Sequence, residues 1–152
     1  MTDTPRFTAN FSRKVMEKSF PFERTEKDWL ISICNADANN VRHVGGFDRV
    51  EYFHFDDVID DEDRWGPTEA DIDRIVATIN EARELNKNVW VNCHAGICRS
   101  GAVVVLLEML GWTYVADYSI KPIPNMIVLD LLRKRFDELQ HSWEVDPGSV
   151  DF

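Results

Sequence analysis

A cysteine and an arginine stand six positions apart in the second half of this 152-residue chain, at Cys93 and Arg99. The five residues between them are His94, Ala95, Gly96, Ile97 and Cys98. A short loop that leads into a helix can direct its backbone N–H groups at one point, where the helix dipole also favours an anion. We therefore predict that the residues from His94 to Arg99 bind a phosphate group.

The same surroundings favour the thiolate form of Cys93. The pKa of a cysteine falls from about 8.5 to roughly 3.5–7.5 at a helix N-terminus or beside an arginine. A thiolate that faces a bound phosphate can attack the phosphorus and take the phosphoryl group onto sulfur. We predict that Cys93 is a nucleophile, that Arg99 holds the anion and that Ser100 places a hydroxyl near the sulfur. The alternative is an inert buried cysteine in a strand, turn and helix.

The flanking residues predict the elements that position this loop. Val89, Trp90 and Val91 favour a β-strand before it. Residues 102–110 are apolar nearly all round, which predicts a buried helix after it. Gly96 permits the backbone conformation and the close approach that an anion-binding loop needs.

The remaining pattern predicts one α/β domain over residues 1–152. We expect strands at 29–34 and 50–55 and helices at 68–85 and 125–139. Thr68 and Asp71 are expected to cap the start of the 68–85 helix. We predict an arm or a short β element for residues 1–28 and a frayed tail for residues 141–152. Strands joined through helices indicate a mostly parallel sheet with helices on both faces. The 93–99 loop would lie at the carboxyl end of a strand, where such sheets bind ligands.

Composition excludes several classes of function. The formal net charge of −10 disfavours nucleic acid and anionic membranes as partners. Three cysteines, two of them in one loop, do not make a disulfide framework and favour a cytoplasmic location. We expect no signal peptide, because no apolar run follows the first residues, and no membrane span. We also expect a monomer.

The segment from Cys93 to Ser100 resembles the Cys-x5-Arg-Ser/Thr signature of the cysteine-based protein phosphatases, most closely the dual-specificity and tyrosine phosphatase branch. Residues 52–57 resemble that family's strand and general-acid loop, and residues 118–125 its late Pro-Asn segment. The resemblance implies a phosphatase fold and hydrolysis of phosphomonoesters through a cysteinyl-phosphate. The implied substrates are phosphotyrosine, phosphoserine or phosphothreonine in proteins, and small phosphoesters. No metal or organic cofactor is implied.

The resemblance also implies a general acid in the acidic loop. The family's acid lies just beyond the strand, which selects Asp57, 36 positions before Cys93. The loop offers other carboxylates as alternatives: Asp56, Asp60, Asp61 and Asp63. A proton donor to the leaving oxygen is worth about 10²–10⁴-fold in rate.

One departure from the family pattern opens two other functions. Asn92 stands where the family has a histidine that helps to set the loop and the pKa of the cysteine. If the thiol is inert, the chain is a non-catalytic phosphate-binding module. The second alternative is an arsenate reductase that cycles through a disulfide between Cys93 and Cys98.

Three minor questions stay open from the residues alone. Cys98 is either a small core residue or the partner of an oxidised Cys93. His94 either adds positive charge near the anion or is merely exposed. A zinc site from Cys34, Cys93, His94 and Cys98 matches no usual ligand spacing, so we expect no metal.

Overall fold

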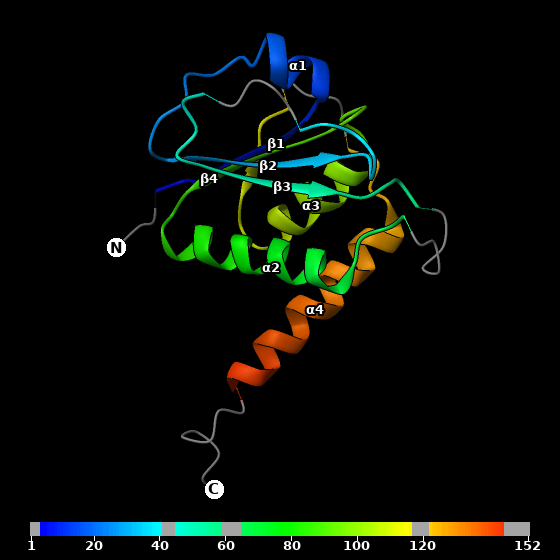
Figure 1. Ribbon diagram of the computed structural model, residues 1–152. Coiled ribbons are helices and arrows are strands. Elements are labelled where there is room, and N and C mark those ends of the chain that lie inside the picture. The colour runs from blue at the N-terminus through cyan, green and yellow to red at the C-terminus, as the bar shows by residue number, and fades with distance from the viewer. Residues whose placement is uncertain (1–3, 41–44, 59–64, 117–121, 145–152) are drawn as a thin grey trace, which may run out of the picture.

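The computed structural model describes residues 4–40, 45–58, 65–116 and 122–144 (Figure 1). Within these ranges the elements are, in chain order, β1 (Phe7–Ser12), α1 (Arg13–Lys18), β2 (Asp28–Cys34), β3 (Arg49–His54), α2 (Glu69–Glu84), β4 (Asn88–Cys93), α3 (Arg99–Met109), β5 (Thr113–Tyr114) and α4 (Met126–Glu144). In this part of the chain, no helix is long and apolar enough to cross a membrane.

The described strands form one sheet with the order β3-β2-β4-β1-β5, and every pairing is parallel. This confirms the predicted α/β fold. In the register, Ser12 of β1 lies beside Cys93, and Ser32 of β2 lies beside Asn92. The carboxyl ends of the strands therefore meet at one edge of the sheet, where the loop after Cys93 begins.

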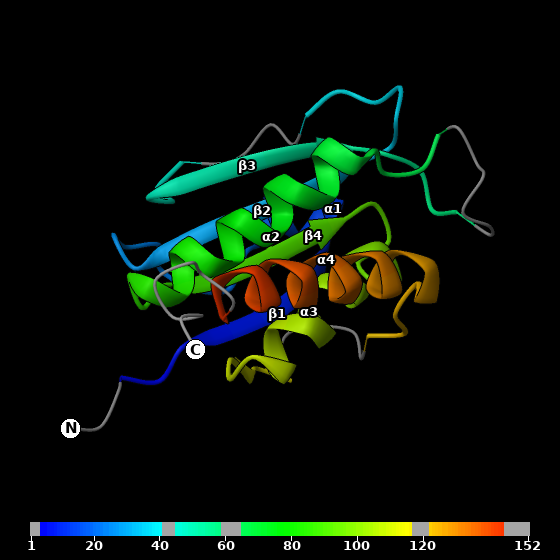
Figure 2. The same cartoon turned by 90° about the horizontal axis from the view of Figure 1, so that it is seen from below.

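Three helices cover one face of the sheet. Helix α4 lies between α2 and α3 and contacts both (Figure 2). The apolar residues on one side of α2, which include Ile72, Ile75, Val76 and Ile79, are buried in this layer. Helix α3 is buried on most of its sides, as its nearly uniform apolar sequence predicts.

The other face has one short helix, α1, and a group of aromatic side chains (Figure 1). Phe20 contacts Phe11, Phe22 and Trp90, with ring centroids 5.2, 5.7 and 5.8 Å away. Helices therefore lie on both faces, as expected, but unequally, because α1 has only six residues.

The N-terminal segment belongs to the sheet and is not an arm. Strand β1 lies between β4 and β5, and its residues from Thr8 to Phe11 are buried. The short β element was thus the correct alternative. The sequence did not predict that this strand is buried. Thr8 and Asn10 alternate with apolar residues, as in a strand with one exposed side, but both sides of β1 are covered.

The helix boundaries follow the predicted capping. Thr68 and Asp71 form a capping box at the start of α2. Gly111, at φ 107°, follows the end of α3. Helix α4 continues to Glu144, beyond the predicted end at 139, and the frayed tail expected from 141 stays a prediction. The rest of that tail and the predictions on residues 59–64 and 118–121 fall outside the described residues.

Candidate active site

The loop between β4 and α3, which we call the anion loop after its predicted ligand, lies at the carboxyl edge of the sheet. Strand β4 ends at Cys93 and α3 begins at Arg99. The N-cap residue of α3 is Cys98, and its side chain makes no capping hydrogen bond. The first N–H groups of this helix are therefore available for an anion, which the helix dipole favours.

Cys93 stands where β4 ends and this loop begins. The residue is only 2% exposed. Its Sγ is 3.2 Å from the Ser100 hydroxyl, and the Gly96 N–H donates to the same sulfur at 3.2 Å. A hydroxyl and an amide thus face the sulfur, an arrangement that suits a negative charge on it.

One side of the loop rests against β1. The Asn10 side chain donates from Nδ2 to the Gly96 carbonyl at 2.5 Å, and the Arg13 N–H donates to the His94 carbonyl at 3.1 Å. Gly96 has φ 77°, and a Cβ there would collide with the backbone nitrogen of Ser12 and lie 2.8 Å from the carbonyl oxygen of Phe11. Only glycine fits this close approach.

The Arg99 guanidinium is fixed from the opposite side. Its Nη1 donates to Asn35 Oδ1 at 2.7 Å and to the Phe55 carbonyl at 2.8 Å. The residue is 6% exposed, and no carboxylate among the described residues forms an ion pair with it. A buried cation whose partners in the described structure are neutral oxygens favours an incoming anion, because buried charge is costly without a counter-charge.

Asp57 lies at the rim of the loop and is exposed. Asn125 Nδ2 donates to Asp57 Oδ1 at 2.6 Å and to the Val58 carbonyl at 2.9 Å. The Asn125 backbone N–H donates to the Cys98 carbonyl at 2.9 Å. Asn125 also caps α4, since its Oδ1 accepts from the N–H groups of residues 127 and 128. One asparagine thus joins the acidic loop, the anion loop and α4.

Cys98 contacts the same carboxylate. Its half-buried thiol lies near the Asp57 carboxylate, whose charge acts on it. The pKa of Cys98 is raised, first by burial and then by the negative charges of Asp57 and Cys93. Cys98 is therefore a poor thiolate at neutral pH.

The other predicted residues differ in their surroundings. His94 and Ala95 are exposed, and Ile97 is half-buried. Asp56 is half-buried and accepts from the Ala36 N–H at 2.9 Å, which gives it a structural role. Asp60, Asp61 and Asp63 lie outside the described residues, and within the described ones no group of side chains could hold a metal ion.

Sequence reasoning assigned no role to the three asparagines that hold this site. Asn10, Asn35 and Asn125 come from β1, from the loop after β2 and from the residue before α4. Two signals were present: Asn10 is a polar residue in the middle of a strand, and Asn125 ends the segment that resembles the family's late Pro-Asn segment. Asn35 stands in loop-like sequence, where asparagine is common for reasons of turn geometry.

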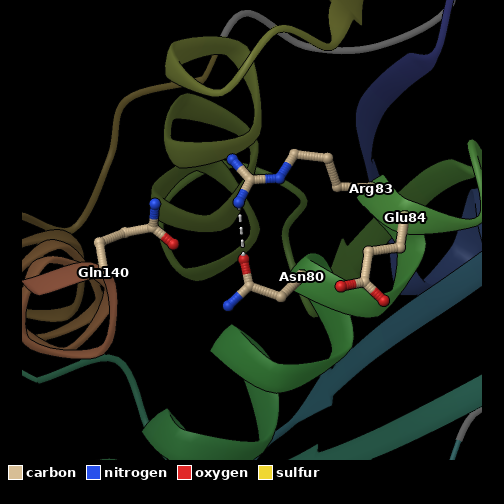
Figure 3. Close-up of a pocket in the computed structure, with 4 residues that line it drawn as sticks. All are labelled: Asn80, Arg83, Glu84 and Gln140. Carbon is tan, nitrogen blue, oxygen red and sulfur yellow. Dashed lines mark hydrogen bonds between the residues drawn. The ribbon is translucent and has the colours of Figure 1, made fainter. Parts of the chain in front are cut away.

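Two hollows lie between α2 and α4, away from the cysteine loop. One, of about 240 Å³, is lined by Asn80, Arg83, Glu84 and Gln140 (Figure 3). The other, of about 270 Å³, includes Thr68, Asp73, Lys134 and Arg135. In the first hollow, Arg83 donates to Asn80 Oδ1 at 3.2 Å, so these two side chains already share a hydrogen bond. Neither lining contains a cysteine or a histidine.

The arrangement is similar to a known phosphatase fold. The crystal structure of human DUSP28, a dual-specificity phosphatase, aligns with a TM-score of 0.52 and 14% identity. The alignment covers 89% of this chain and 94% of that one. No protein-family model matches the sequence, and no curated protein matches it. The predicted resemblance to the dual-specificity branch is thus confirmed at the level of the fold.

Proposed function

We propose that this protein is a phosphomonoester hydrolase of the protein tyrosine and dual-specificity type, which acts through a cysteinyl-phosphate. The observation that carries the proposal is the buried Arg99, without a carboxylate partner among the described residues, beside an uncapped helix N-terminus and the Cys93 thiol. A positive charge, a set of free amides and a nucleophile in one loop have a common use in phosphoryl transfer.

The reaction takes two steps. Cys93 Sγ attacks the phosphorus in line as the bond to the leaving oxygen breaks, and Asp57 gives that oxygen a proton. Water then attacks the phosphocysteine, Asp57 takes a proton from it, and the thiolate leaves with a hydrogen bond from Ser100. The loop amides and Arg99 hold the phosphoryl oxygens, Arg99 through its Nε and Nη2 in a bidentate contact.

The low exposure of the nucleophile supports phosphotyrosine as the main substrate. Cys93 is 2% exposed, and the exposed His94 and Ala95 lie next to it in the loop. The phenyl ring of phosphotyrosine holds the phosphate farther from the peptide backbone than the short side chains of phosphoserine and phosphothreonine do. We propose phosphotyrosine in proteins first, then phosphoserine and phosphothreonine, and small aryl phosphates as assay substrates.

The surroundings of Cys98 argue against the arsenate reductase alternative. That cycle needs Cys98 to attack an adduct on Cys93 as a thiolate. Its raised pKa disfavours this form at neutral pH. The three free cysteines support a reducing compartment such as the cytoplasm for this thiol chemistry.

The variant Cys93→Ser tests the proposed function. It should keep the fold and bind vanadate, yet lose essentially all hydrolysis of an aryl phosphate, because the weaker serine nucleophile has no base beside it. Ser32→Ala, which removes a buried hydroxyl on β2, is the control for handling and folding, and this variant should keep its activity. Substantial turnover by a clean Cys93→Ser preparation would overturn the mechanism.

A further inference from the structure

Asn10 is fully buried, and both ends of its side-chain amide have partners. Its Nδ2 donates to the Gly96 carbonyl at 2.5 Å, and its Oδ1 accepts from the Tyr114 hydroxyl at 3.2 Å. Gly96 in turn donates its N–H to Cys93 Sγ at 3.2 Å. A continuous chain of hydrogen bonds thus runs from β5 through β1 to the sulfur.

Asn92, the residue directly before the nucleophile, does not hold the loop through its side chain. Asn92 is also fully buried, but within the described structure neither atom of its side-chain amide has a hydrogen-bond partner. The anchor of the loop therefore comes from the neighbouring strand. Its position in the sequence, 83 residues before Cys93, gives no hint of this.

We propose that Asn10 is the positioning residue of the anion loop, which fixes Gly96 so that its N–H points at the Cys93 thiolate. This inference rests on the proposed function, since it takes Cys93 as the nucleophile. The rigid carbonyl contact keeps the amide directed at the sulfur, and Tyr114 orients the Asn10 amide by occupying its oxygen. A flexible loop would turn that N–H toward solvent and lose the stabilisation of the thiolate.

A nearby residue provides a matched control. Thr8 lies two positions earlier on β1, so its side chain is on the same side of the sheet. It is also fully buried, and its hydroxyl has no partner in the described structure. Thr8→Val therefore perturbs the same strand without touching the hydrogen-bond chain.

The experiment measures the rate of iodoacetate alkylation of Cys93 against pH in the full chain, with the site identified by peptide mass. Asn10→Ala should raise the midpoint of the profile and slow alkylation at neutral pH by about tenfold, the order expected from a lost hydrogen bond to a charged group. Tyr114→Phe should move the midpoint in the same direction by less. Thr8→Val should match the wild type.

The outcomes separate this proposal from the proposed function. If the wild type hydrolyses no phosphomonoester but Asn10→Ala still shifts the alkylation midpoint, the function fails and the positioning role stands. A folded Asn10→Ala protein with the wild-type midpoint would overturn the role of Asn10. If Asn10→Ala does not fold, Tyr114→Phe decides, and an unmoved midpoint there counts against the proposal.

Discussion

The two sides of the anion loop are built in opposite ways. On the β1 side, Asn10 and Gly96 are buried, and the loop touches backbone so closely that a methyl group does not fit. On the α4 side, Asp57 is exposed and is held by the side chain of Asn125. The first side is fixed by buried contacts, through the Asn10 amide and the close backbone approach at Gly96, and the second by a side-chain hydrogen bond to an exposed carboxylate.

This difference matches two demands of phosphoryl transfer. The donors that bind the phosphate must not reorganise during the reaction, so they gain from a rigid support. The general acid must reach both the leaving oxygen and water, so it has to stand at an open rim. We therefore expect changes on the β1 side to alter stability and thiol reactivity, and changes on the α4 side to alter proton transfer.

The largest expected effect is on the α4 side. Asp57→Asn should lower kcat on phosphotyrosine by about 10²–10⁴, with a much smaller change in KM, because the leaving oxygen loses its proton donor. The loss should shrink on an aryl phosphate whose leaving group needs little protonation. Steady-state kinetics on the two substrates measure this directly.

Asp56→Asn is the matched control for that experiment. An asparagine can still accept from the Ala36 N–H, so this variant should lose less than about tenfold in kcat, as expected for a charge on a partly solvated loop. Asp60→Asn and Asp61→Asn should also lose less than about tenfold. If one of these three gives the large loss and Asp57→Asn does not, the acid has been assigned to the wrong residue.

Gly96→Ala sharpens the comparison from the β1 side. The added Cβ meets the backbone at Phe11 and Ser12 and also requires a left-handed conformation. We expect a loss of about 2–5 kcal/mol in the free energy of unfolding and a fall in activity, measured by chemical denaturation and kinetics. Gly45→Ala, where a Cβ meets nothing within 4 Å, should change neither. An unimpaired Gly96→Ala would show that this side is not rigid.

A smaller effect is expected at Asn125, which serves both the acid and a helix. Asn125→Ala should lower kcat by about tenfold by releasing Asp57, and stability by about 1 kcal/mol by removing the cap of α4. Asn125→Asp separates the two roles, because aspartate caps a helix but repels Asp57. It should restore stability and not kcat. Recovery of both quantities would mean that Asn125 acts only as a cap.

Cys98 should give the smallest effect, visible only after oxidation. Its raised pKa keeps it protonated at neutral pH, so it should trap a sulfenic acid on Cys93 more completely as the pH rises. Intact mass after peroxide should show loss of two hydrogens, reversed by dithiothreitol, and Cys98→Ala should recover less activity. Equal recovery in both proteins would leave Cys98 as a packing residue.

The sequence predicted the parts of this molecule that depend on local pattern. The strand before Cys93, the apolar helix after it and the capping box at Thr68 all follow from periodicity and spacing over a few residues. The place of Cys93 at the carboxyl edge of a parallel sheet followed from the order of elements.

The supports of the site depend on contacts between distant residues, and the sequence did not predict them. Asn10 contacts Gly96 across 86 positions, and Asn125 contacts Asp57 across 68 positions. Strand β1 was ambiguous for the same reason, because its polar residues are satisfied or enclosed by neighbours that local pattern cannot reveal. Such pairs become visible only once the register of the sheet is known.

The most direct test of the central claim is to trap the covalent intermediate. In Asp57→Asn, an activated aryl phosphate should still phosphorylate Cys93, while hydrolysis slows because the water lacks its base. Acid quench and peptide mass analysis should then find one phosphoryl group on Cys93 in Asp57→Asn. They should find none in the double variant that combines Cys93→Ser with Asp57→Asn. Turnover with the phosphoryl group on another residue, or with unchanged rate in the double variant, would contradict the account.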